Sequence, residues 1–240
     1  MENSKGAAIL ALGIIIASAI GAGAFYKAKS LDNILSVTGS AKRKVTSDQV
    51  KWTAGFSRTI FDGNLKGGYS QMAQDTELVK KFLVGQGLKD SDINISPVYM
   101  EQPGLYDRQN YPNADKQYIL RQTVEVQSAD VEKVTELSKK TDQLINQGVV
   151  FATQGVEYYY SKLPDLRVEL LSDAVKDAQV RADNIAKSSG QSVGSLRSAS
   201  MGVVQVLAPN SVDVSDYGQY DTSKIDKEVM VTVKAGFSMK

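Results

Sequence analysis

An uncharged apolar run near the start of the chain constrains what the rest can become. Residues 6–25 carry no charged side chain and lie between Lys5 on one side and Lys27 and Lys29 on the other. A membrane-spanning helix needs about 20 consecutive apolar residues, and it satisfies its own backbone hydrogen bonds in lipid. We therefore predict that residues 1–29 are an N-terminal membrane anchor or signal segment and that residues 30–240 form one exported domain.

The fate of this leader has alternative interpretations. Ala22-Gly23-Ala24 supplies the small residues of a signal cleavage site before Phe25, whereas the run is longer than the apolar region of a typical signal, about 7–15 residues. A buried helix in a soluble core is the remaining alternative. Lysines on both sides leave the orientation open. The long polar remainder favours a domain outside the cytoplasmic membrane, anchored and periplasmic, or periplasmic or secreted after cleavage.

Charges are balanced along the chain, and two chemically versatile residue types are missing. Lysine and arginine number 28 against 27 aspartates and glutamates, with no histidine and no cysteine. Nucleic-acid binding needs a concentrated basic face, and the short cluster Lys42-Arg43-Lys44 is more typical of a solvated strand start. Without cysteine there is no disulfide, and metal sites built from cysteine or histidine are excluded. We expect no nucleic-acid partner, no metal and no cofactor.

Apolar periodicity predicts a regular series of strands and helices after a short tether at residues 27–35. Period-two alternation indicates a strand, and a spacing of three to four residues indicates a helix. In chain order we expect strand 45–61, helix 65 to about 85, strands 93–100 and 118–126, helix 130 to about 147, strand 149–161, helix 164–189, and strands 193–207 and 227–239. Two long polar loops, 102–116 and 208–223, interrupt the series.

The order of these elements predicts the fold class. The first six read strand, helix, strand, strand, helix, strand, which is the ferredoxin-like order. We therefore predict an α+β fold with a largely antiparallel sheet and helices on one face. Its ferredoxin-like βαββαβ core is extended by a third helix and C-terminal strands. Since disulfides are excluded, the hydrophobic core, assembly or both must stabilise the domain.

Several segments of the exported part carry a resemblance to a known family. They include Val37-Thr38-Gly39-Ser40-Ala41, the stretch 118–134, the Ala-Val-x-x-Ala-x-x-Arg-Ala series at 174–182, and residues 225–237. Together they resemble the SIMPL-domain family, also called DUF541 or the periplasmic immunogenic protein family, over about residues 36–240. The resemblance implies an envelope or periplasmic α+β protein, and some members form large ring- or channel-like oligomers. It implies no catalytic residues, and the two long loops match nothing specific.

Catalytic patterns are weak in this chain. Residues 190–194 match the G-x-S-x-G of serine hydrolases, but that chemistry needs a strand-to-helix turn and a histidine base. Here the pattern follows a helix and is better explained as a glycine helix stop. Asp213, Asp216 and Asp221 share one loop without the spacing of a calcium loop, which favours a solvated acidic loop. Since no carboxylate pair stands out, we predict a protein that is not an enzyme.

Tyrosines in the two long loops are the candidate interface or ligand residues. Tyr106 and Tyr111 lie in loop 102–116, and Tyr217 and Tyr220 lie in loop 208–223. Tyrosine is enriched at interfaces because it joins an apolar ring to a polar tip. The alternative is that these rings fold back onto their own domain.

Two functions are compatible with these features. The first is a non-enzymatic cell-envelope protein that acts through self-association, as a homo-oligomer, and through surface interactions with other envelope components. The second is a periplasmic binding module for a small molecule, a peptide or a cell-wall fragment, with loops 102–116 and 208–223 as its rim.

Overall fold

The structure is a computed structural model that describes residues 2–30, 33–61, 63–103, 117–211 and 213–239, with side chains described for residues 6 and 10–26 of the first helix. Its helices are α1 (Glu2–Ser30), α2 (Leu65–Gly85), α3 (Val131–Leu137), α4 (Asp142–Ile145) and α5 (Leu163–Ser188), with a short 3-10 helix at Asp90–Asp92. Its strands are β1 (Ile34–Thr46), β2 (Gln49–Phe61), β3 (Ile93–Ile95), β4 (Tyr99–Glu101), β5 (Gln117–Ser128), β6 (Phe151–Tyr159), β7 (Val193–Met201), β8 (Gln205–Leu207), β9 (Gln219–Tyr220) and β10 (Asp226–Met239).

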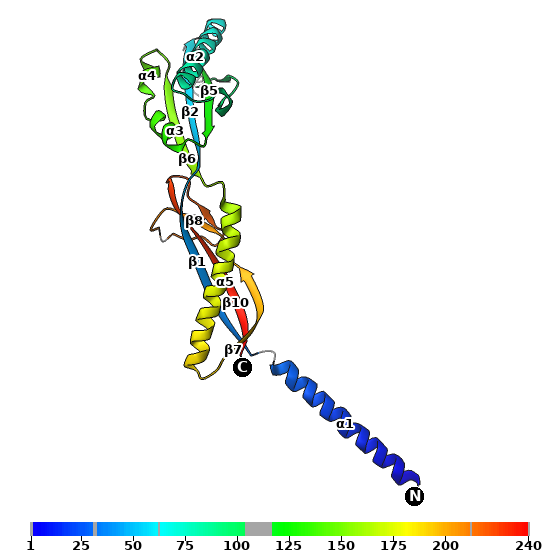
Figure 1. Cartoon of the computed structure of the whole chain (residues 1–240). Coiled ribbons are helices and arrows are strands. Elements are labelled where there is room, and N and C mark those ends of the chain that lie inside the picture. Colours follow the sequence, from blue (N-terminus) through cyan, green and yellow to red (C-terminus); the bar gives the residue numbers. More distant parts are fainter. Residues whose placement is uncertain (1, 31–32, 62, 104–116, 212, 240) are drawn as a thin grey trace.

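Sheet A is built from segments near the two ends of residues 33–239. Its central strand β10 pairs with β1 on one side and with β7 and β8 on the other, and β9 adds a short parallel pair with β8. The long helix α5 packs against β1 and β10 (Figure 1). Its contact face consists largely of alanines, Ala174, Ala178 and Ala182, all fully buried. Small side chains allow the helix axis to lie close to the sheet.

Sheet B is built from the middle of the chain. Its strand order is β3-β5-β2-β6, with β4 also pairing with β5, and these pairings are antiparallel. Helices α2 and α3 cover one face. Trp52 lies fully buried at the centre of that core, between Phe151 and the helices, with Met72 from α2 and Val134 from α3 also fully buried. Alternation along β2 and β5 therefore places their other side chains on an uncovered face.

The two sheets lie end to end, and two short chain segments connect them. Residues 47–48 join β1 to β2, and residues 160–162 join β6 to α5. Figure 1 shows the unit of sheet A with α5, then the unit of sheet B with α2 and α3 beyond it. The start of β1 and the C-terminal end of β10 lie at the far end of sheet A, where α1 precedes them. We call the region between the sheets the junction.

The comparison with the predicted fold is mixed. The α+β class and the largely antiparallel pairing are confirmed, and helices at 65–85 and 163–188 agree closely with expectation. The prediction of one sheet was wrong, because the strands form two separate sheets. A tether was expected at 27–35 and a first strand only from residue 45, but residues 34–46 form β1, which pairs with β10. The predicted strand 45–61 is therefore the end of one strand and the whole of another. Strand 193–207 is likewise divided into β7 and β8.

Helix α1 stands apart from both sheets in Figure 1. It has 29 residues, and its described apolar side chains, such as Leu10, Ile15, Ile20 and Phe25, are each more than half exposed. Among the residues whose side chains are described, no helical stretch proved both long enough and apolar enough to cross a membrane.

Candidate functional site

The predicted site tyrosines have different surroundings. Tyr106 and Tyr111 lie outside the described residues. Tyr217 is 96 % exposed on the loop between β8 and β9, whereas Tyr220 lies in β9 itself and is 37 % exposed. The described residues therefore do not show the four tyrosines on one surface. Tyr217 and Tyr220 also differ in how far their side chains are exposed.

Tyr220 belongs to the junction between the two sheets. Its hydroxyl oxygen accepts the backbone N–H of Tyr160 at 3.0 Å. Its ring lies 5.8 Å from the ring of Tyr159, centroid to centroid, at the end of β6. The predicted interface residue is thus an internal contact, which joins β9 of sheet A to the last strand of sheet B.

A buried lysine organises the loop next to Tyr220. Lys227 is fully buried, and its ammonium donates to the backbone oxygens of Asp221 and Lys224, at 2.5 and 2.8 Å. The same nitrogen lies 5.6 Å from the centroid of the Tyr220 ring. Burial lowers the pKa of Lys227, and the charge of Asp221 opposes this effect. Sequence reasoning missed Lys227, although it has the same strand parity as the buried Val229 and Val231.

Asp48 fixes the other side of the junction. Its carboxylate accepts the backbone N–H of Ser161 at 2.8 Å and the hydroxyl of Ser161 at 2.7 Å. Burial by itself would raise the pKa of Asp48, yet these hydrogen bonds outweigh burial, so that the pKa lies below its usual value. Further backbone bonds run from Ser47 to Ile225, and from Tyr158 to Thr222. Both connections between the sheets are therefore hydrogen-bonded.

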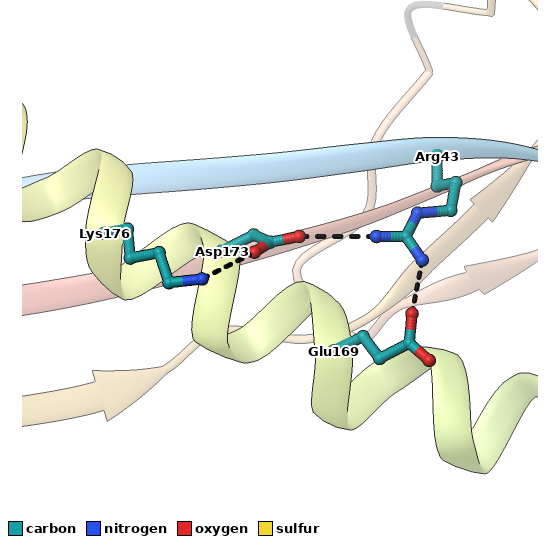
Figure 2. Close-up of polar contacts among 4 residues, drawn as sticks. All are labelled: Arg43, Glu169, Asp173 and Lys176. Carbon is teal, nitrogen blue, oxygen red and sulfur yellow. Dashed lines mark hydrogen bonds and ion pairs between the residues drawn. The ribbon is translucent and has the colours of Figure 1, made fainter.

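A ladder of ion pairs joins α5 to strand β1. Figure 2 shows Arg43 of β1 bonded to both Glu169 and Asp173 of α5, and Asp173 also bonded to Lys176 at 3.3 Å. One turn further on, Asp177 accepts the backbone N–H of Ser40 at 2.8 Å. The predicted basic cluster 42–44 is therefore in a strand, and Arg43 is paired with carboxylates.

A cleft of about 860 Å³ lies on sheet B, between the α2–β3 connection, the start of β2 and the turn from β5 into α3. Its lining is more polar than apolar and includes Gln49, Asp92, Asn94, Glu125 and Gln127. A second cleft of about 330 Å³ shares Gln49 and Gln127 with it.

The cleft residues were not singled out by the sequence. Alternation placed Glu125 and Gln127 on the solvent side of the strand at 118–126, but it could not show that Gln49 and Asn94 come from neighbouring strands. Those positions meet only because β2 and β3 both pair with β5.

Within the described part of the chain, there is no group of three or more acidic side chains arranged to hold a metal ion. Gly190, of the G-x-S-x-G pattern, has a φ of +71° directly after α5, which fits a helix stop.

Comparison with known proteins gives one informative result. No curated protein matches the chain. The family model described as "SIMPL: Protein of unknown function (DUF541)" matches residues 35–237, which is most of the chain and covers both sheets. The chain therefore belongs to the SIMPL (DUF541) family.

Proposed function

We propose that this protein is a non-enzymatic component of the cell envelope, held at a membrane by residues 1–29, and that its exported domain acts through self-association. The observation that carries the proposal is the long outer edge of β1. The alternative is a binding module for a small molecule, a peptide or a cell-wall fragment.

The leader supports the location. Its 20-residue run at 6–25 has the length that a bilayer requires and lacks charge. A helix whose apolar side chains stand exposed in water is costly, and lipid would remove that cost. Because β1 begins four residues after α1 ends, sheet A would lie near the membrane and sheet B roughly 40 Å further out, given the 13-residue length of β1.

The edge of β1 supports self-association. Among the strands that the structure describes, β1 is the terminal strand of sheet A, and its partner β10 pairs with one side of it. The backbone N–H of Ser40 points away from β10, since it donates to Asp177. Backbone groups alternate sides along an antiparallel strand, so the N–H of Thr38 also points outward. An exposed strand edge is a template for pairing with another chain, and a second copy of this chain supplies the partner strand.

The outward amide of Thr38 provides the test. In sedimentation velocity of the full chain in a density-matched detergent, we expect Thr38→Pro to shift the distribution towards the monomer, because proline removes the donor while remaining tolerated on an edge strand. Thr38→Val keeps the amide and is the matched control. If the Thr38→Pro and Thr38→Val chains sediment as the same oligomer, with equal melting temperatures, the β1 edge is not the contact.

Protease accessibility tests the location. Protease added to spheroplasts should cleave residues 30–240 while a cytoplasmic marker stays intact. Protection of the domain until lysis would contradict an external location.

We also infer that sheet B with α2 and α3 is a ferredoxin-like unit. Its support is the strand order β3-β5-β2-β6 with antiparallel pairing throughout, in which a helix follows β2 and another follows β5. Sheet A and α5 then form a second unit, whose segments come before and after the ferredoxin-like unit in the sequence.

The binding-module alternative has its own discriminating experiment. Replacing Tyr106, Tyr111 and Tyr217 with alanine should abolish ligand binding and leave oligomer size unchanged if the loops form a rim. If the protein self-associates through these loops, the same substitutions should change the size of the oligomer instead. Tyr220 is left out of this set because its replacement would disturb the junction.

A further inference from the structure

The cleft of about 860 Å³ on sheet B is independent of the proposed self-association surface. It is formed at the junction end of the sheet, by side chains on the face that α2 and α3 leave uncovered, together with the α2–β3 connection and the start of α3. Its volume falls within the range of about 300–1,000 Å³ that is typical of ligand sites. Among the residues that line the cleft are Gln49, Asn94 and Gln127, which come from three different strands.

Three side-chain amides contribute to the lining of this cleft. Gln49, Asn94 and Gln127 each offer an N–H donor and a carbonyl acceptor on one planar group. The amide of Gln127 is held in place, since its nitrogen donates to Glu125 at 2.6 Å. Neighbouring hydroxyl groups on a ligand, which both donate and accept, are the natural complement of such paired donors and acceptors.

Charge in and beside the cleft is balanced. Lys89 and Lys133 line it together with Asp92, Glu125 and Asp130, and Lys51, which lines the adjoining smaller cleft, is bonded to Glu125 at 3.1 Å. The ammonium of Lys133 also donates to the backbone oxygen of Gly87 at 2.7 Å. Three positive and three negative groups select neither an anion nor a cation, which favours a neutral ligand.

An aromatic ring lies at one end of the combined clefts. Tyr159 lines the smaller cleft, and its ring is fixed against the ring of Tyr220. The apolar residues of the large cleft are few, and Leu88 among them is buried in the core. An aromatic face next to amides and carboxylates suits the C–H face and the hydroxyls of a sugar ring.

We propose that the clefts on sheet B bind a neutral oligosaccharide, with Gln49, Asn94 and Gln127 as hydrogen-bonding residues and Tyr159 as the stacking platform. A peptide recognised by strand addition would bind the backbone groups of a sheet edge, and one recognised through its side chains would need apolar pockets. A short peptide is therefore the competing ligand in the test.

The test is isothermal titration calorimetry of the full chain in detergent with a neutral N-acetylglucosamine tetrasaccharide, and with an uncharged Gly-Ala tetrapeptide of similar size. We expect saturable binding of the tetrasaccharide at millimolar concentration or below, and none of the peptide. Asn94→Ala and Gln127→Ala should each weaken binding at least tenfold. Gln74→Ala replaces an exposed amide on α2 outside the cleft and should bind as the unaltered chain does.

Absence of tetrasaccharide binding by folded protein would overturn the proposal. So would tetrasaccharide binding that survives both cleft substitutions unchanged, or preferential binding of the peptide. Melting temperatures of the variants establish that they are folded. Sedimentation of the same samples separates this result from self-association, because loss of saccharide binding leaves oligomer size unaffected.

Discussion

At the scale of single residues, Gly39 sets how closely α5 approaches β1. A Cβ added there would collide with the backbone oxygen of Ala174 and the backbone nitrogen of Ala178, and would lie 2.8 Å from the Cα of Ala178. These are backbone atoms of a helix and cannot turn aside as a flexible side chain can. The glycine and the alanine stripe therefore form one packing arrangement, and both belong to segments that carry the family resemblance.

We expect Gly39→Ala to lower the free energy of unfolding by about 3 kcal/mol, because overpacking forces α5 and β1 apart. Urea unfolding followed by circular dichroism measures the change. Gly155→Ala is the matched control, since a Cβ at Gly155, also in a strand, meets no described atom within 4 Å. Equal losses for the two variants would show that the close approach at Gly39 does not matter.

The buried ammonium of Lys227 predicts a pH dependence. Because burial lowers its pKa below the ordinary value of 10.5, the unfolded chain binds more protons than the folded chain between the two pKa values. The free energy of unfolding should therefore rise with pH in that window, up to about 10.5. In Lys227→Met this contribution is missing, so the unaltered chain should gain stability relative to the variant as the pH increases from 8 to 10.5.

Chemical denaturation at several pH values measures this difference. Lys234→Met, an exposed substitution on the same strand, controls for the loss of one positive charge. A difference between the unaltered chain and Lys227→Met that stays constant from pH 8 to 10.5 would contradict the prediction.

At the scale of elements, two aspartate–arginine contacts between a helix and a strand have different environments. The Asp75 side chain of α2 is 3 % exposed, and it holds Arg58 of β2 through two hydrogen bonds, at 2.5 and 2.7 Å. The Asp173 side chain of α5 is 44 % exposed and contacts Arg43 at 3.3 Å. Screening by water weakens the exposed pair, whereas the buried carboxylate depends on its partner.

We expect Asp75→Asn to destabilise the protein by about 2 kcal/mol, and Asp173→Asn by less than about 1 kcal/mol. Each change keeps the size of the side chain and removes one charge, so the two variants are controls for each other. Thermal unfolding of both proteins gives the comparison. A loss at Asp173→Asn as large as that at Asp75→Asn would show that burial does not separate the two contacts.

Elements with local periodicity could be predicted, and their fine detail could not. The apolar spacing of α2 and α5 predicted both helices to within a few residues. From the sequence, Leu170, Ala174, Ala178, Ala182 and Ile185 form the inner face of α5, because Ile185 is hydrophobic. In the structure Ile185 is 47 % exposed and Ala186 is buried instead, because the buried face keeps the four-residue spacing of the alanines.

At the scale of the whole molecule, the two-sheet architecture could not be predicted from local patterns. The pairing of β1 with β10 joins Ile34 to Ser238 and Thr46 to Asp226, across almost the whole length of the chain that follows α1. Periodicity shows which residues share a face but not which strands are neighbours. The junction and the polar cleft both depend on such distant pairings, which is why neither was foreseen, and why the sequence left open whether Tyr220 lies at an interface or folds back onto its own domain.

The architecture also relates location to function. If residues 1–29 lie in a membrane, sheet A with its β1 edge is next to the membrane, and the cleft of sheet B is presented beyond it. Neighbouring copies confined to one membrane would meet at similar heights, which favours contacts between their sheet A edges.

Sedimentation equilibrium of the full chain in density-matched detergent, at concentrations up to tens of micromolar, measures whether the protein self-associates. Self-association predicts a protein mass that is a multiple of the 26.0 kDa of one chain. A mass that stays at 26.0 kDa over the whole concentration range would contradict it.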